Sequence, residues 1–245
     1  MRFDDKVVIV TGAAGGIGLA TARRFGREGA RVVLADHDAA KADAAAAAMR
    51  ADGAPDALAF RCDVASDSDV EHTVDAAIAR FGRLDVVVNN AGVMIFKPIE
   101  AHSEADLLHV LQVDFLGAFR FVRQAFLKCR PGASIVNVAS IHAIETTPLV
   151  SAYAAAKAAL LSLTRSAAIE GRPKGIRVNA VLPGAIETTM LRDNPNVRSG
   201  AEVLDPADIG SPDDIAAAVA FLASDDAAFV TGIDLRVDGG RLARL

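Results

Sequence analysis

The sequence predicts a single α/β domain, in which a parallel β-sheet of about seven strands is covered by helices on both faces. Two observations lead to this fold class. Strand and helix patterns alternate along all 245 residues without a linker-like stretch, and such alternation is typical of parallel sheets built from βαβ units. Hydrophobic residues make up 52% of the chain, which is enough for one large core. We therefore expect one domain over residues 1–245.

Charge and composition exclude several classes of partner. The 26 basic and 31 acidic residues give a net charge of −5 without a long run of one sign, so we expect no nucleic-acid surface and no polybasic membrane contact. No apolar run is long enough to span a bilayer, and the acidic N-terminus does not resemble a signal peptide. Cys62 and Cys129 lack the spacing of metal ligands, which indicates reduced thiols in a cytoplasmic protein without a metal site.

Residues 6–18, KVVIVTGAAGGIG, combine a strand, a glycine turn and the start of a helix. The β-branched run at 7–10 suits a buried strand, and Gly12, Gly16 and Gly18 follow in the spacing G-x-x-x-G-x-G, with Ile17 opening the helical pattern. Glycine lets the backbone approach a pyrophosphate, which the N–H groups of a helix N-terminus bind. The segment predicts a dinucleotide-phosphate site; the alternative is an ordinary strand-to-helix turn.

A second strand at 31–36 ends in Asp36, about 20 residues after the glycine turn, where a ribose-binding carboxylate is expected. Asp36 would accept hydrogen bonds from the adenosine ribose and repel a 2′-phosphate. Ala14 and Ala35 leave no basic side chain in the turn or before the acid to hold that phosphate. We therefore predict NAD in preference to NADP. The alternative is that Asp36 only caps the next helix.

The rest of the chain continues the alternation. Helices are expected at 38–52, at 66–81 with Ser66 and Asp69 as a capping-box-like pair, at 103–129, at 151–169 and at 212–224, and strands at 57–63, 84–89, 134–139, 176–182 and 233–237. Residues 187–211 show no clear period and are expected to form a substrate loop or lid. Ligands of such sheets bind beyond the carboxyl ends of the strands, where Thr11, Asp36, Asp63, Asn89, Ser140 and Pro183 are expected.

Ser140, Tyr153 and Lys157 are the candidate catalytic residues. Lys157 follows Tyr153 by four positions, so both lie on one helix face and the ammonium can approach the phenol. A nearby cation favours the phenolate and lowers the tyrosine pKa, so Tyr153 could take a proton from an alcohol while Ser140 holds the substrate oxygen. The alternative is that Tyr153 and Lys157 are ordinary helix residues.

Seven segments together resemble the short-chain dehydrogenase/reductase family over the whole chain. They are TGAAGGIG at 11–18, DV at 63–64, NNAG at 89–92, NVAS at 137–140, YAAAK at 153–157, NAVLPGAIET at 179–188 and TGIDLRVDGG at 231–240. The resemblance implies a Rossmann-type, doubly wound sheet in the strand order 3-2-1-4-5-6-7 and a nicotinamide dinucleotide cofactor. It further implies a homotetramer in which the helices at 103–129 and 151–169 pack against their copies in a neighbouring subunit.

The same resemblance implies roles for individual residues. Ser140 would stabilise the oxyanion or alkoxide, Tyr153 would be the general acid/base, and Lys157 would lower the tyrosine pKa and hold the nicotinamide ribose. Further cofactor contacts fall on Asp63 and Val64 at the adenine, on Asn90, Ala91 and Gly92 along the cofactor, on Pro183 and Gly184, and on the Ile186 backbone and the Thr188 hydroxyl at the carboxamide.

One segment departs from the family pattern. The long helix usually carries an asparagine that holds a proton-relay water beside the lysine, whereas this chain reads Val113-Asp114-Phe115. Asp114 keeps acceptor oxygens and lacks the N–H₂ donor. If ionised, it would attract Lys157 and offset that lysine's effect on Tyr153. We place Asp114 with the catalytic residues as a tolerated variation.

The leading hypothesis is an NAD-dependent oxidoreductase that acts on a small-molecule secondary alcohol or ketone. An apolar pocket is expected from the loops around Met94 and Ile141 and from Met190 and Leu191, and His142 could contact the substrate or have no role. The alternatives are a 3-oxoacyl carrier-protein-type reductase that uses NADPH, which Asp36 disfavours, and a non-catalytic NAD-binding regulatory protein, which only Asp114 favours.

Overall fold

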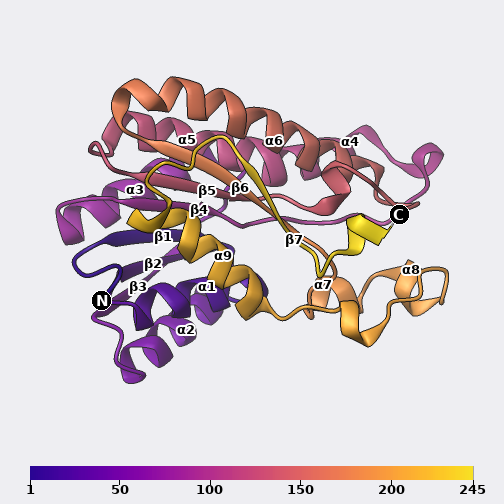
Figure 1. The fold of residues 1–245 in the computed structure, drawn as a ribbon, viewed down its shortest axis with the longest axis horizontal. Coiled ribbons are helices and arrows are strands. Elements are labelled where there is room, and N and C mark those ends of the chain that lie inside the picture. The colour runs from indigo at the N-terminus through magenta and orange to yellow at the C-terminus, as the bar shows by residue number, and fades with distance from the viewer. Residues whose placement is uncertain (245) are drawn as a thin grey trace.

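A computed structural model describes residues 1–244 and contains a seven-stranded sheet in the order β3-β2-β1-β4-β5-β6-β7 (Figure 1). Every pair of neighbouring strands runs parallel. The predicted fold class and strand order are therefore confirmed. The final position of the predicted domain, residue 245, lies outside the described residues.

The elements alternate as expected from the sequence. The strands are β1 (Val7–Thr11), β2 (Arg31–Asp36), β3 (Asp56–Arg61), β4 (Val86–Asn89), β5 (Ser134–Val138), β6 (Arg177–Pro183) and β7 (Asp234–Val237). The helices are α1 (Gly16–Arg27), α2 (Ala39–Ala51), α3 (Asp67–Phe81), α4 (Glu104–Leu111), α5 (Gly117–Lys128), α6 (Ser151–Gly171), α7 (Thr189–Arg192), α8 (Pro195–Arg198) and α9 (Pro212–Ala223).

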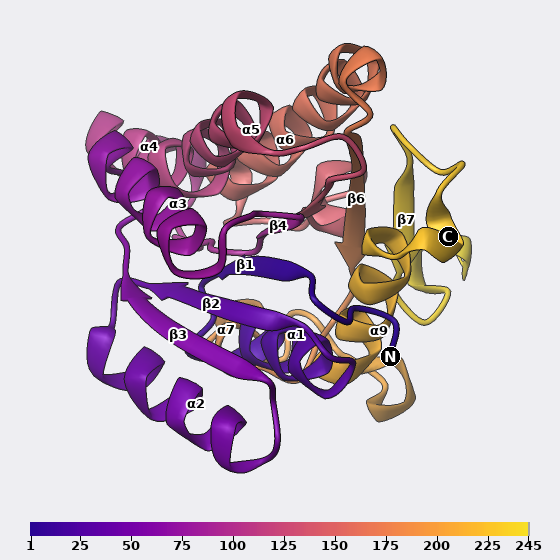
Figure 2. The ribbon, with the colours of Figure 1, turned by 90° about the vertical axis from the view of Figure 1, so that its left-hand side faces the viewer.

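Both faces of the sheet are buried, because successive residues of a strand point to opposite faces. In β1, Val8 and Val10 belong to the core that also holds Phe25 of α1. Val7 and Ile9 of the same strand belong to the core on the other face. Figure 2 shows the two layers, with α1, α2 and α9 on one side and α3 to α6 on the other. This double coverage explains the continuous apolar strands in the sequence.

The order of the strands reverses at β1, which pairs with β2 on one side and with β4 on the other. Connections leave the sheet in opposite directions at such a point, and a crevice opens at the carboxyl ends of the strands. Thr11 ends β1 and Asn89 ends β4. The fold therefore brings the glycine turn and the NNAG segment together at this edge.

The single helix expected at 103–129 is wrong in one detail, because a π-helical turn at Gln112–Leu116 separates α4 from α5. The N–H of Gly117 donates to the carbonyl oxygen of Gln112, five residues earlier. Arg120 donates to the side-chain oxygen of Gln112 at 2.7 Å and so supports the widened turn. Such turns occur frequently at functional sites, and this one carries the buried Asp114.

Two local predictions need correction. Residues 187–211 are not wholly irregular, because Thr188 and Asn194 cap the one-turn helices α7 and α8 through side-chain hydrogen bonds. Ser66 caps α3 as expected, but the Asp69 carboxylate accepts the backbone N–H of Asp63 instead of completing a capping box. Among residues 1–244, no helix has the length and apolar character needed to cross a bilayer.

Candidate active site

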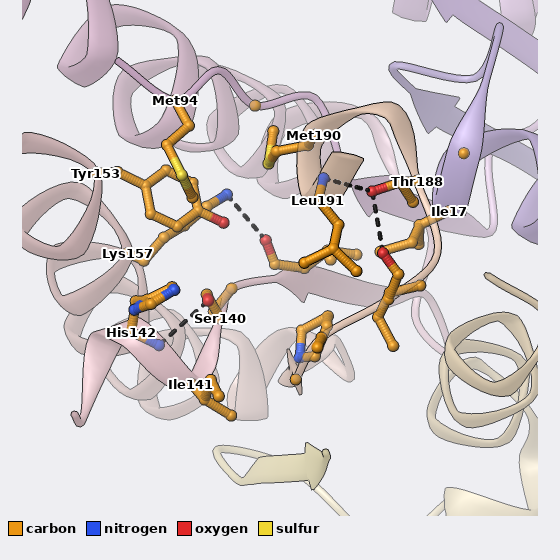
Figure 3. A pocket seen from close by; sticks show the side chains of 18 of the residues that line it. Ile17, Met94, Ser140, Ile141, His142, Tyr153, Lys157, Thr188, Met190 and Leu191 are labelled. Carbon is orange, nitrogen blue, oxygen red and sulfur yellow. Dashed lines mark hydrogen bonds between the residues drawn. The ribbon is translucent and has the colours of Figure 1, made fainter. Parts of the chain in front are cut away.

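A cavity of about 270 Å³ opens at the carboxyl ends of the central strands. It brings together most of the site residues expected from the sequence, namely Gly12, Gly16, Ile17, Asn90, Ala91, Gly92, Ser140, Tyr153, Lys157, Pro183, Gly184, Ile186 and Thr188. Figure 3 shows Ser140, His142, Tyr153 and Lys157 gathered at one side, with Thr188, Met190 and Leu191 across from them. The cavity thus extends from the glycine turn to the catalytic candidates.

The glycine turn at one end of this cavity has the features of a phosphate cradle. Gly12 and Gly16 have φ of 62° and 51°, a backbone conformation that favours glycine. Gly15 precedes α1 without a side-chain cap, so the first N–H groups of the helix are free to bind an anion. Nothing lies within 4 Å of a Cβ placed on Gly15, which leaves the backbone open to close approach. These features fit the pyrophosphate of a dinucleotide.

Gly18 packs against the backbone of the glycine turn and does not line the cavity. A Cβ at this position would lie 2.1 Å from the carbonyl oxygen of Gly12, so only glycine allows α1 to pack this closely against the turn. Asn90 also stabilises the turn, because its Nδ2 donates to the carbonyl oxygens of Thr11 at 2.9 Å and of Gly12 at 3.2 Å. The NNAG segment therefore shapes the cradle as well as lining it.

Asp36 lies at the end of β2 and is buried. Its Oδ2 accepts the N–H of Ala14 at 2.9 Å, and its Oδ1 accepts the N–H of Asp38 at 3.0 Å. The idea that Asp36 only caps the next helix is wrong, because the side chain of Asp38 is the N-cap of α2. A carboxylate has lone pairs for further hydrogen bonds, so Asp36 can brace the glycine turn and still accept a ribose hydroxyl.

Asp63 and Val64 lie after β3 and do not line the cavity, in contrast to most of the expected cofactor residues. The Asp63 carboxylate accepts the N–H of Ala65 at 2.9 Å. The carbonyl oxygen of Val64 accepts a hydrogen bond from Arg120 at 3.1 Å. Their expected contact with adenine stays a prediction.

Ser140, His142 and Tyr153 form a contiguous group (Figure 3). The Oγ of Ser140 accepts the N–H of His142 at 3.1 Å, which closes the turn after β5. The His142 ring meets the Tyr153 ring edge-on, with centroids 6.1 Å apart. His142, whose role the sequence left open, therefore lies in the cavity wall beside the candidate acid/base.

Lys157 lies one helical turn after Tyr153 and forms an ion pair with Asp114. The Nζ of Lys157 is 3.2 Å from Oδ2 of Asp114 and donates to the carbonyl oxygen of Val138 at 3.1 Å. Oδ1 of Asp114 accepts the N–H of Val93 at 2.8 Å. A Cβ at Gly92 would lie 2.9 Å from the carboxylate and 3.3 Å from the ammonium. The expectation that Asp114 attracts Lys157 agrees with this geometry.

The buried groups shift one another's titration. Burial raises the pKa of Tyr153, Lys157 lowers it, and Asp114 raises it further. Burial alone would lower the pKa of Lys157, but Asp114 and Tyr153 together raise it above its usual value. Burial likewise raises the pKa of Asp114, with Lys157 opposing. The cation near Tyr153 thus acts in the expected direction, but burial and Asp114 outweigh it.

A buried chain of polar side chains, which was not predicted from the sequence, fixes the position of α6. Asn89 at the end of β4 donates to Asn137 of β5 at 2.8 Å, and Asn137 donates to Thr164 of α6 at 2.8 Å. All three residues are buried, and a buried polar group without a hydrogen bond is costly. The three side chains are therefore held in this arrangement. They tie α6, which carries Tyr153 and Lys157, to the sheet. In the sequence, the asparagines of the NNAG and NVAS segments could have indicated these hydrogen bonds.

The cavity also has a lining that the sequence analysis missed. Glu202, in the loop after α8, and Arg241, in the C-terminal turn, both line it, and Nη2 of Arg241 donates to Oε1 of Glu202. Asn194, at the start of α8, completes the polar part of this wall. No local sequence motif predicts these contacts, because they depend on how two irregular segments fold over the sheet.

Comparisons with known proteins extend over nearly the whole chain. A family model described as "Enoyl-(Acyl carrier protein) reductase" matches residues 12–241. The 3beta-hydroxysteroid dehydrogenase 1 of Eggerthella lenta is 40% identical over 251 residues, which cover 97% of this chain and 95% of that protein. The cis-4-hydroxycyclohexanecarboxylate dehydrogenase of Sinomonas cyclohexanicum is 42% identical over 246 residues and 98% of each chain. The solved structure of a short chain dehydrogenase from Burkholderia cenocepacia in complex with NADP matches with a TM-score of 0.90 at 32% identity, over 98% of each chain.

Proposed function

This chain belongs to the short-chain dehydrogenase/reductase family, and from this premise we propose that it is an NAD-dependent oxidoreductase of secondary alcohols and ketones with Tyr153 as general acid/base. One observation carries the proposal. Ser140, Tyr153 and Lys157 meet in the wall of a cavity that also contains the glycine turn. Phosphate-binding backbone and proton-transfer groups thus face one space, as a hydride transfer to or from a dinucleotide requires.

Tyr153, Ser140 and Lys157 each have a separate role in the proposed reaction. A bound nicotinamide supplies the hydride acceptor for oxidation and the hydride donor for reduction. Tyr153 takes the proton from the alcohol oxygen during oxidation and returns it to the ketone oxygen during reduction. Ser140 donates a hydrogen bond to that oxygen and holds it near Tyr153. The ammonium of Lys157 favours the phenolate form of Tyr153.

The preference for NAD rests on Asp36. Its carboxylate lies at the end of β2, next to the glycine turn, where a 2′-phosphate would meet a buried negative charge. His37 is the adjacent basic candidate, and its Nδ1 lies 3.3 Å from Oδ1 of Asp36 with the imidazole exposed to solvent. Because this nitrogen faces the Asp36 carboxylate, we expect His37 to offset the charge of a 2′-phosphate only weakly.

We propose a mostly apolar, ring-bearing substrate. Met94, Ile141, Met190 and Leu191 line the cavity, and residues 187–211 cover it as a substrate lid. The two relatives act, by their names, on a hydroxysteroid and on a hydroxycyclohexanecarboxylate. Alcohols on saturated rings are therefore the first compounds to test.

We also propose a homotetramer in the cytoplasm. The outer face of α5 and α6 holds an apolar groove of about 700 Å³ that includes Phe119, Phe126 and Leu163. Phe119 and Leu127 are exposed there, and such a face favours burial against a second copy of this chain.

The cytoplasmic location rests on Cys62 and Cys129, which are both free thiols.

The decisive test incubates the purified protein with NAD and a panel of secondary alcohols and measures NADH formation by its absorbance. The proposal predicts turnover with at least one ring alcohol and loss of turnover in Tyr153→Phe. The second candidate, a 3-oxoacyl carrier-protein-type reductase, would instead use NADPH with an acyl thioester; the matching family model, described as an enoyl-(acyl carrier protein) reductase, also names an acyl-carrier substrate. Binding of NAD without turnover on any substrate would support a regulatory protein.

A further inference from the structure

Three ionisable side chains line the cavity without a part in the proposed reaction. His142 comes from the turn after β5, Glu202 from the lid and Arg241 from the C-terminal turn. We call these residues the polar cluster. Arg241 donates to Glu202, so the cluster joins the lid to the C-terminal turn. The charges of Glu202 and Arg241 both act on His142, and the three residues line the same cavity as apolar side chains such as Met190 and Leu191.

The polar cluster has unused hydrogen-bonding capacity. Oε2 of Glu202 and Nδ1 of His142 are buried and have no hydrogen-bond partner among residues 1–244. Such groups are costly unless a ligand or water satisfies them. Glu202 lines the cavity, so a ligand group there can supply the hydrogen bond that its free oxygen lacks. A guanidinium also has N–H groups beyond the one that Arg241 gives to Glu202.

The charge of the polar cluster selects the kind of group that fits. Glu202 neutralises the charge of Arg241. Burial lowers the pKa of His142, which disfavours a charged imidazole in the cluster. A carboxylate would add a second negative charge beside Glu202 and could donate nothing to it. A ketone oxygen could accept from Arg241 or His142 and would leave Glu202 unsatisfied. A hydroxyl donates and accepts at once, so it suits the cluster best.

We propose that the polar cluster binds a second hydroxyl group of the substrate, so that the preferred substrates are diols in which one secondary alcohol is oxidised and the other hydroxyl is recognised. The second hydroxyl donates to Glu202 and accepts from Arg241 or His142. This inference rests on the proposed function, because it names the substrate class of the same site. Glu202, Arg241 and His142 are then specificity-determining residues for the proposed reaction.

The first experiment compares kcat/KM with NAD for cyclohexanol, for the cyclohexane-1,2-, 1,3- and 1,4-diols, and for cis-4-hydroxycyclohexanecarboxylate. We expect at least one diol to exceed cyclohexanol by about tenfold, the order of a hydrogen bond to a charged group. In Glu202→Met this ratio should fall to about one, because the diol loses more of its kcat/KM than cyclohexanol does. Glu202→Gln, which keeps an acceptor oxygen, restores part of the preference.

A control variant tests whether any ion pair of the lid would give the same result. Glu187 pairs with Arg192 on the exposed side of the lid, and neither residue lines the cavity. Glu187→Met should leave the diol preference unchanged. Binding is measured without turnover by calorimetry on Tyr153→Phe with NAD present, where the preferred diol should bind about tenfold more tightly than cyclohexanol and lose this advantage in the double variant with Glu202→Met.

The outcomes separate the two proposals. Equal losses for cyclohexanol and the diols in Glu202→Met would show that the ion pair only closes the lid, which overturns the inference. Preference of the parent enzyme for the hydroxycarboxylate over every diol would also overturn it. Oxidation of cyclohexanol without any preference for a diol leaves the proposed function standing and removes the inference alone. No turnover with any alcohol would count against the proposed function itself.

Discussion

Replacing Asp114 with asparagine removes one charge from the centre of the site at nearly constant volume. The carboxylate is buried in the π-helical turn before α5 and faces Lys157. It raises the pKa of Tyr153, whereas Lys157 lowers it. Because the phenolate is the form that takes the proton in oxidation, loss of the negative charge should let alcohol oxidation reach its plateau at lower pH.

The size of this shift follows from the geometry. Oδ2 of Asp114 lies 3.2 Å from Nζ of Lys157, which lies 5.4 Å from the centre of the Tyr153 ring. The carboxylate is therefore within about 9 Å of that ring. At an effective dielectric constant of about 20, two unit charges about 9 Å apart interact by about 1.8 kcal/mol, so loss of the carboxylate should stabilise the phenolate by an energy of this order. We expect the rising limb of the profile to move to lower pH.

The assay is kcat/KM for alcohol oxidation as a function of pH in the parent and in Asp114→Asn. The apparent pKa belongs to the coupled group of Asp114, Tyr153 and Lys157 rather than to Tyr153 alone. Asp75→Asn is a matched control, since Asp75 pairs with Lys128 on the surface. Superimposable profiles would show that Asp114 is not coupled to catalysis. A shift to higher pH would show that Lys157 loses its proton without Asp114, which also contradicts the reasoning.

Three further predictions concern the cofactor and the assembly. NAD should bind at least about tenfold more tightly than NADP by calorimetry, and Asp36→Ala should narrow this ratio; equal dissociation constants in the parent would contradict the role of Asp36. Gly18→Ala should lower the Tm and weaken NAD binding, because the added Cβ would lie 2.1 Å from the Gly12 carbonyl oxygen; an unchanged Tm would refute the tight packing of α1. Light scattering at micromolar concentration should give a tetramer that Phe119→Glu dissociates, and a monomeric mass for the parent would refute the assembly.

The sheet was predictable because its signals are local and repeated. Buried parallel strands are short β-branched runs such as 7–10, and turns and caps separate them from the helices. The position of the cavity was predictable for the same reason, since polar residues such as Asn89 and Ser140 stand where strands end. The helix at 103–129 was predicted without its π-helical turn, because one additional residue per turn leaves almost no trace in an apolar period.

Features that depend on long-range packing could not be read from the sequence. The contact between Glu202 and Arg241 joins residues 39 positions apart, and nothing in either segment specifies the other. Whether the pKa of Tyr153 rises or falls depends on its burial. The spacing of four residues between Tyr153 and Lys157 gives no information about burial. The sequence showed the direction in which Lys157 acts, while the structure shows that burial and Asp114 act against it.

The central claim is that Tyr153 is the general acid/base, and Tyr153→Phe tests it most directly. This variant keeps the aromatic ring, which is buried against Ala152 and Ala156, and removes the hydroxyl alone. The measurement is kcat for oxidation of the best alcohol with saturating NAD, alongside NAD binding by calorimetry. We predict that NAD still binds and that kcat falls by at least about a hundredfold. Turnover close to that of the parent would contradict the assignment of Tyr153 and, with it, the proposed mechanism.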